Sequence, residues 1–206
     1  MSSIERHAWV GDRVRKLGKE TFQRAKNTRR SKRQRLEDAA DAVAYFFLAD
    51  VQMNHIDPSQ RRGGYDEKAM RQARRLLFQI ANIPLENPSA FTHAVRADMQ
   101  MERSADLIRE LATLQEDGMP RYFQMDRALD AYIYAVAGEW EWRVNKGIFS
   151  RSVRGIPKEF KHVQRVALRE ILEIGGAPTR NPRRRKKTKR KSNASSVRAL
   201  VRRALS

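Results

Sequence analysis

Cysteine is absent from this chain of 206 residues. The absence excludes disulfides, thiolate zinc sites, iron–sulfur clusters and cysteine nucleophiles, and it is compatible with a reducing compartment. Glycine and proline are scarce, with 10 and 7 residues, and 40% of the residues are hydrophobic, so the chain is neither collagen-like nor uniformly disordered. What the sequence holds instead is charge of one sign. Lysine and arginine outnumber aspartate and glutamate by 43 to 24, which gives a formal net charge of +19.

Long hydrophobic runs are also missing. The longest strongly apolar stretch, residues 39–51, is interrupted by Asp41 and Asp50 and is shorter than the roughly 20 residues that a bilayer-spanning helix needs. The first residues meet Glu5 and Arg6 at once and lack the apolar centre of a secretory signal. We therefore expect no membrane partner and an intracellular protein, located in the cytoplasm or nucleoid, in the nucleus of a eukaryotic host, or inside a virion.

The excess positive charge is concentrated at the two ends of the chain. Residues 1–36 carry a net charge of +9 and residues 180–206 carry +12, which leaves −2 for residues 37–179. This distribution predicts a basic N-terminal helical arm over 1–36, a helical bundle domain over 37–179, and a basic tail over 180–206 with a short amphipathic helix at its end. Such strong basicity indicates a polyanionic partner, more often nucleic acid than an anionic membrane.

Helical periodicity dominates the middle of the chain, where no set of alternating strand segments occurs. Over residues 66–83, for example, apolar side chains recur at i, i+4, i+7, i+11 and i+14. We predict an all-α fold, a compact bundle of about five to six helices with basic N-terminal and C-terminal extensions, whose short connections favour antiparallel neighbours. The expected helices span residues 4–24, 31–55, 66–83, 87–117, 120–146 and 157–174.

No constellation for catalysis or metal binding is evident. The four histidines lie on different segments without the spacing of a helical metal site, and no glycine-rich phosphate loop occurs. The pair Glu159 and Lys161 matches the acid-x-lysine pattern of some metal-dependent nucleases, but it falls in the first turn of an expected helix, where a solvated role is favoured. We expect no cofactor, no metal and no enzymatic activity, with a nuclease as a minor alternative.

Clustered basic residues are the main candidates for a binding site. Each phosphate that they neutralise releases condensed counterions, and such contacts position a protein on nucleic acid without reading its sequence. A nuclear-localisation signal and a solubilising tail are the alternative interpretations. The residues predicted to contact nucleic acid are Arg29, Arg30, Lys32, Arg33, Arg35, Arg61, Arg62, Arg183, Arg184, Arg185, Lys186, Lys187, Lys189, Arg190 and Lys191.

Two tryptophans and two glutamates alternate over residues 139–142. Adjacent carboxylates on a helix point about 200° apart, so this pair cannot act as one acid–base couple. Trp142 with Arg143 is a candidate platform for stacking an unpaired base. The structural alternative places Trp140 in the core and Trp142 at a seam or interface.

Together these patterns predict a non-enzymatic protein that binds the phosphate backbone of DNA or RNA, largely without sequence readout, as a subunit of a larger nucleoprotein assembly with other protein subunits. The alternative is a structural or interaction protein whose bundle assembles with protein partners, while its tails only touch a polyanionic surface. In that case Trp142, Tyr132 and Tyr134 would be exposed contact residues.

Overall fold

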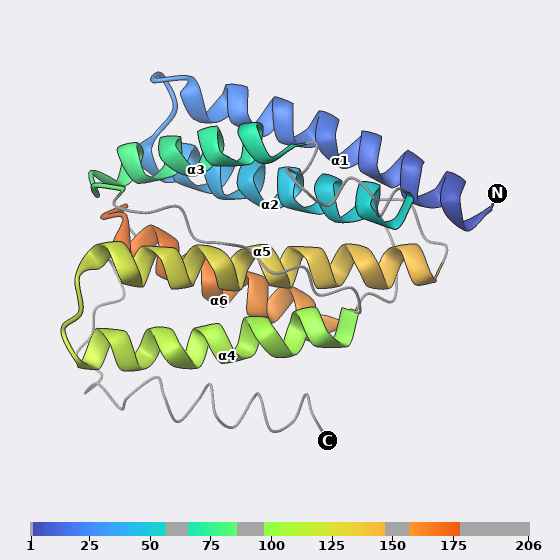
Figure 1. The fold of residues 1–206 in the computed structure, drawn as a ribbon. Coiled ribbons are helices and arrows are strands. Elements are labelled where there is room, and N and C mark those ends of the chain that lie inside the picture. Colours follow the sequence, from blue (N-terminus) through green and yellow to red (C-terminus); the bar gives the residue numbers. More distant parts are fainter. Residues whose placement is uncertain (1, 57–65, 86–96, 147–156, 178–206) are drawn as a thin grey trace.

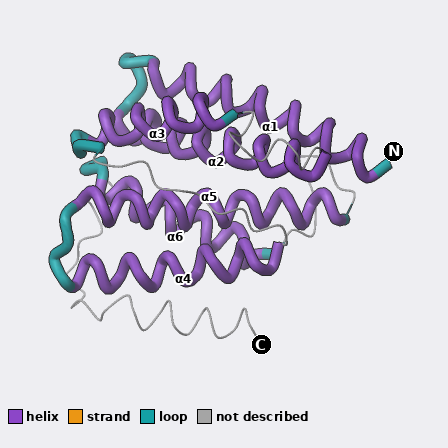
Figure 2. The backbone as a smooth tube through the Cα atoms, in the orientation of Figure 1, coloured by secondary structure: helices purple, strands orange, loops and turns teal. Residues whose placement is uncertain are grey.

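The computed structural model describes residues 2–56, 66–85, 97–146 and 157–177, and within these ranges it contains six α-helices and no strands (Figures 1 and 2). The all-α prediction is confirmed. The described helices are each too polar or too short to cross a lipid bilayer. Their bounds are α1 Ser3–Lys26, α2 Lys32–Ile56, α3 Glu67–Ala81, α4 Ala97–Glu116, α5 Arg121–Asn145 and α6 Lys158–Ile174.

The observed helices follow the sequence periodicity closely. The expected bounds of α1, α2, α3, α5 and α6 agree with the structure to within two residues at each end. α3 ends at Ala81, and its C-cap Asn82 adopts a left-handed conformation with φ 56° two residues before Pro84. The predicted start of the fourth helix at residue 87 and the predicted connector over 148–156 lie outside the described residues.

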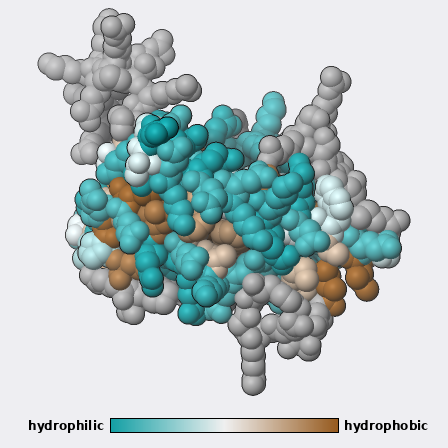
Figure 3. All heavy atoms as spheres, turned by 90° about the horizontal axis from the view of Figure 1, so that it is seen from above, coloured by the Kyte–Doolittle hydropathy of each residue, from teal (hydrophilic) through white to brown (hydrophobic). Residues whose placement is uncertain are grey.

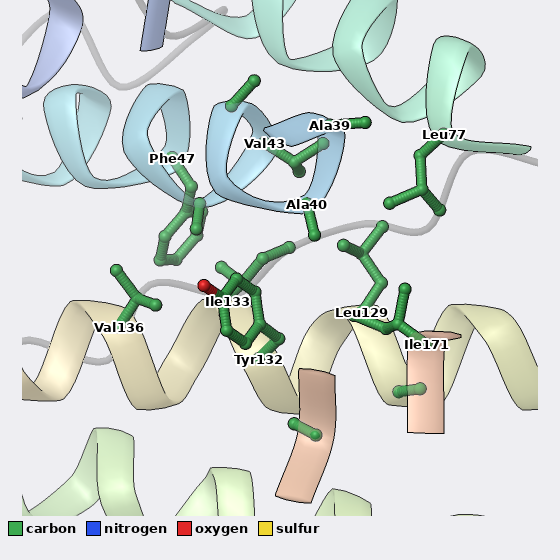
Figure 4. Close-up of a cluster of buried hydrophobic side chains, with 14 of the residues drawn as sticks. Ala39, Ala40, Val43, Phe47, Leu77, Leu129, Tyr132, Ile133, Val136 and Ile171 are labelled. Atoms are coloured by element: carbon green, nitrogen blue, oxygen red, sulfur yellow. The ribbon is translucent and has the colours of Figure 1, made fainter. Parts of the chain in front are cut away.

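Helices α2 and α5 form the middle of the molecule (Figure 1). α1 and α3 pack on α2, whereas α4 and α6 pack on α5. Side chains from all six helices share one hydrophobic cluster. Within it Phe47 of α2 and Ile133 of α5 meet, and Leu77 of α3 and Ile171 of α6 lie further along, near Leu129 of α5 (Figure 4). Each of these residues is fully buried, which stabilises the fold by about 1.5–3 kcal/mol per side chain.

α1 is held at its start by a capping box and along its length by close packing. The Ser2 hydroxyl accepts from the backbone N–H of Glu5, and the Glu5 carboxylate accepts from the backbone N–H of Ser2. Gly11 and Gly18 face α2, and a Cβ atom on Gly18 would lie 3.0 Å from ring carbons of Phe46. Glycine lowers helix propensity, but here its missing side chain permits the close approach of two helices.

The N-terminal helix therefore belongs to the bundle. Val10, Val14 and Ala25 of α1 are fully buried in the common core, as is Leu36. The division at residue 36, which the charge distribution suggested, is not a division of the packing. The apolar stripe of α1 is narrow and the outer positions of this helix are basic. The net charge of residues 1–36 therefore does not reveal that α1 contributes to the core.

α5 carries four buried carboxylates, each with polar partners. Asp126 is ion-paired with Arg74 of α3, and Glu141 accepts a hydrogen bond from Gln52 Nε2 at 3.1 Å. Burial opposes ionisation of Glu139, but hydrogen bonds from Lys161, Arg143 and Gln164 hold the pKa of this carboxyl below its usual value. The fourth, Asp130, lies 3.9 Å from Arg127 Nη1. The interior charges are thus compensated within the protein.

Candidate nucleic-acid interface

Five exposed cations form a row along α1 and the turn that follows it. We call this row the α1 ridge; it consists of Arg13, Lys16, Lys19, Lys26 and Arg29. Within the part of the chain that the structure describes, no ridge residue forms an ion pair. Lys26 Nζ lies 4.7 Å from the ring centroid of Phe22. At 1.5 Å per residue the ridge extends about 20 Å from Arg13 to Lys26.

The orientation of the ridge follows from the apolar stripe of the same helix. Val10, Val14 and Leu17 point into the core, so positions 13, 16 and 19 are left on the outside. Two acidic residues lie among the cations of this surface. Asp12 is paired with Arg15 at 3.0 Å, and Glu20 is exposed. The ridge with Glu20 thus keeps a clear excess of positive charge.

Arginines on either side of the ridge are engaged in structural ion pairs. Arg15 Nε lies 2.9 Å from the Asp66 carboxylate, just before α3. Arg24 and Arg30 both contact Asp38, with distances of 2.9 Å to its two oxygens. These pairs connect α1 and its following turn to the rest of the bundle, so they hold the ridge in place.

The predicted phosphate-binding run over residues 29–35 has a mixed character in the structure. Arg33 Nε lies 2.8 Å from Glu37 Oε1, and Arg35 Nε donates to the backbone carbonyl of Ala25 at 2.9 Å. With Arg30 held by Asp38, two of the five predicted cations, Arg30 and Arg35, support the α1–α2 connection, while the pair of Arg33 and Glu37 lies within α2. Arg29 is exposed and Lys32 is half-buried. The sequence pattern predicted a basic cluster here but not this internal use of it.

Trp142 and Arg143 have different environments. Trp142 is half-buried, whereas Arg143 is only 6% exposed. The Arg143 Nε group donates to Glu139 Oε1 at 2.9 Å, and the guanidinium carbon lies 5.3 Å from the ring centroid of Trp140. Arg143 therefore has a buried structural role, and base stacking at Trp142 with Arg143 stays a prediction.

The expectation that Tyr132 and Tyr134 are exposed contact residues is wrong. They are 6% and 4% exposed. The Tyr132 hydroxyl donates to Asp41 Oδ1, and the Tyr134 ring packs edge-on against Phe47 at 5.8 Å. Because α5 is surrounded by other helices, polar and aromatic residues on several of its sides are buried, and periodicity does not identify an outer face.

Several other sequence predictions can be placed only in part. Arg61, Arg62 and the run from Arg183 to Lys191 lie outside the described residues. Glu159 is exposed in the first turn of α6, while Lys161 Nζ lies 2.7 Å from Glu139 Oε2 and so serves a buried carboxylate. Among the residues with described positions, no group of three acidic or histidine side chains is arranged to hold a metal ion.

The sequence prediction of individual contact residues began at Arg29 and so omitted Arg13, Lys16 and Lys19. The available signal was the stripe of Val10, Val14 and Leu17, which fixes the inward face of the helix and hence the outward one. Comparison of the chain with models of protein families, with curated proteins and with solved structures finds no match. The function must therefore be argued from the residues themselves.

Proposed function

We propose that this protein is a non-enzymatic nucleic-acid-binding protein that contacts the phosphate backbone largely without sequence readout, as a subunit of a nucleoprotein assembly. The observation that carries the proposal is the α1 ridge, whose exposed cations lack internal ion pairs in the described structure. Unpaired surface cations in a row are the arrangement that neutralises consecutive phosphates and releases their counterions.

The anchoring of α1 strengthens this proposal. Val10 and Val14 are fully buried, and Gly18 brings the helix close to Phe46 of α2. The ridge is therefore carried by a fixed helix rather than by a flexible segment, so less conformational entropy is lost when a backbone binds. The contacts would fix the position of the nucleic acid, since phosphate contacts carry no base information.

The test is to neutralise part of the ridge in the full chain. Arg13→Gln, Lys16→Gln and Lys19→Gln together remove three positive charges. A matched control removes three exposed cations outside α1, one at the C-cap of α5 and two on α6, through Lys146→Gln, Lys158→Gln and Arg165→Gln. Binding of DNA and RNA oligonucleotides is measured across a salt series, with circular dichroism to verify folding.

We expect the ridge variant to lower affinity and to reduce the slope of log K against log salt by about 2 to 3, because each lost phosphate contact removes about 0.7 to 0.9. The control should keep a slope near that of the parent protein. Equal effects of the two variants would mean that nucleic acid is attracted by the net positive charge of the protein rather than by the ridge. That result would contradict the assigned interface.

The predicted tail contacts are tested separately. Arg183→Gln, Arg184→Gln and Arg185→Gln in the full chain should also lower the salt slope, and their effect should add to that of the ridge variant if both regions contact phosphates. An unchanged slope would remove the tail from the proposed interface and leave the ridge as its basis.

A further inference from the structure

We infer that the α1 ridge takes single-stranded nucleic acid, with the Trp9 indole as a stacking surface for an unpaired base. The inference rests on the proposed function and adds the strandedness of the ligand and a residue that the sequence prediction had not included. Trp9 is 42% exposed. The other two tryptophans, Trp140 and Trp142, are half-buried.

Trp9 lies on the same face of α1 as the start of the ridge. Positions 9, 13 and 16 are related by i, i+4 and i+7, so Trp9, Arg13 and Lys16 follow one another along the helix surface. At 1.5 Å per residue, Arg13 is about 6 Å and Lys16 about 10 Å from Trp9 along the axis. An aromatic ring is thus followed by two cations without ion pairs in the described structure.

This combination has a specific chemical consequence. Single-stranded nucleic acid is bound by cations that follow its backbone and by aromatic rings on which its bases stack, and every base has a suitable face. In a duplex the bases are already stacked and paired inside the helix. A base on Trp9 with its neighbouring phosphates on Arg13 and Lys16 therefore favours an unpaired strand over a duplex.

The turn of α1 that carries Trp9 is fixed from its inner side. The neighbouring Val10 is fully buried, and His7 Nδ1 lies 2.8 Å from the Oε1 atom of Gln52. The His7 ring also stacks on His55 of α2, with centroids 4.4 Å apart. These contacts set the direction in which position 9 points, so the backbone under Trp9 is organised before a ligand arrives.

The surroundings of Trp9 also argue for a polar ligand. Viewed from the side of α1 and α3, most of the described surface is hydrophilic, with smaller hydrophobic patches toward its two ends (Figure 3). The next outward residues along the helix are Asp12, Arg13 and Lys16, all exposed. An exposed indole followed by charged residues suits a ligand that is both aromatic and anionic, as a nucleotide chain is.

The experiment compares Trp9→Ala and Trp9→Phe with Trp142→Ala, which removes the other predicted stacking residue, in the full chain. Binding is measured to an oligothymidylate, an oligouridylate and a duplex of the same length at one salt concentration, and then across a salt series. We expect Trp9→Ala to weaken single-strand binding about 5- to 100-fold, the range that corresponds to loss of one stacked base. Duplex binding should change less than about 2-fold, and the salt slope should stay unchanged because tryptophan carries no charge.

Two further readouts separate stacking from a structural role. Trp9→Phe should keep most of the single-strand affinity, since phenylalanine also stacks. Ligand-induced quenching of tryptophan fluorescence should be lost in Trp9→Phe and retained in Trp142→Ala. Circular dichroism and thermal unfolding show whether each variant keeps the parent fold.

The outcomes distinguish this inference from the proposed function. If ridge neutralisation abolishes binding but Trp9→Ala acts equally on single strands and duplex, or not at all, the stacking role is overturned and the backbone-binding function stands. If Trp142→Ala has the larger effect, the stacking residue is Trp142. If the parent chain binds no nucleic acid, both the function and this inference are overturned.

Discussion

Helices α1 and α5 carry charged residues under opposite conditions. α5 lies in the middle of the bundle, where its carboxylates at 126, 130, 139 and 141 are no more than 8% exposed. α1 lies at the outside and presents the ridge to solvent. The buried charges of α5 have partners within the fold, whereas the ridge cations form no ion pair among the described residues.

The difference separates charges that maintain the fold from charges that are available to a ligand. An unpaired buried charge is strongly destabilising, which explains why the buried carboxylates of α5 are accompanied by partners. An exposed cation changes the stability of the fold little, whether or not it forms an ion pair. A cation without an ion pair is also free to contact a ligand. Substitution in α5 and its partners should therefore lower stability, while substitution in the ridge should lower binding.

The largest expected effect on stability is at the buried pair of Arg74 and Asp126. The Arg74 side chain is 3% exposed, and burial lowers the pKa of its guanidinium, opposed by the charge of Asp130. Arg74→Ala leaves the buried Asp126 carboxylate without its ion-pair partner and should reduce the free energy of unfolding by about 3–5 kcal/mol. Urea unfolding at neutral pH measures the change.

The adjacent Arg75 provides a matched control for Arg74. It is exposed on the same helix, and Arg75→Ala should change the free energy of unfolding by less than about 0.5 kcal/mol. The double substitution Arg74→Met with Asp126→Leu should recover part of the loss, because it removes a buried charge together with its partner. A similar loss for Arg74→Ala and Arg75→Ala would show that burial does not distinguish these two arginines.

The second prediction concerns Asp41, an enclosed carboxyl whose hydrogen-bond partner is the neutral hydroxyl of Tyr132. Burial raises the pKa of Asp41 from 3.8 to about 6, the hydrogen bond from Tyr132 opposes the rise, and the nearby Asp38 adds to it. The folded state therefore holds the proton more tightly than the unfolded state. Its stabilising contribution is full below about pH 4 and is lost as pH rises through about 6.

The Asp41→Asn variant isolates this contribution. The difference in unfolding free energy between the parent and the variant should change by up to about 3 kcal/mol between pH 4 and pH 7, in favour of the variant at the higher pH. Chemical unfolding at several pH values measures it, and Asp12→Asn, at an exposed position, serves as the control. A constant difference across this range would contradict the raised pKa.

The third prediction compares two glycines of α1. A Cβ atom at Gly18 would lie 3.0 Å from the ring of Phe46, whereas one at Gly11 would lie 3.4 Å from the flexible side chain of Met53. Gly18→Ala should lower the free energy of unfolding by about 1–2 kcal/mol because the ring is buried and must shift. Gly11→Ala should be neutral or stabilising by up to about 1 kcal/mol, since alanine favours the helix.

Thermal unfolding of both glycine variants under identical conditions gives the comparison. Equal stabilisation of the two would mean that Phe46 can move away without cost, and the close approach of α1 to α2 at Gly18 would then not limit the side chain there.

The sequence predicted the helices well because apolar residues at helical spacing determine both the helix and its buried face. The stripe of Phe160, Ala167 and Ile171 in α6 is an example, with all three side chains buried. In α5 the same logic was incomplete. Tyr132 and Tyr134 are buried because neighbours cover that helix on several sides, and a local pattern does not contain the position of those neighbours.

The candidate interface was only partly predictable for a related reason. Counting charges identified the basic N-terminal region, but ion pairs between distant residues decide which cations are engaged. Arg15 contacts Asp66, and Arg24 contacts Asp38, through pairings that depend on tertiary structure. Arg13 and Lys16 remain on the outside without such partners in the described residues, and this distinction emerges only once α1 is packed on α2.

The smallest effect on stability is expected for substitutions in the α1 ridge. Arg13→Gln, Lys16→Gln and Lys19→Gln together should change the free energy of unfolding by no more than about 0.5 kcal/mol, because these exposed side chains form no ion pairs in the described structure and glutamine is a comparable helix former. The change should be neutral or slightly stabilising at low salt, where loss of repulsion between Lys16 and Lys19 counts most. Urea unfolding at low and high salt measures it. A loss as large as that of Arg74→Ala would place the ridge among the charges that maintain the fold and would remove the physical distinction between the two helices.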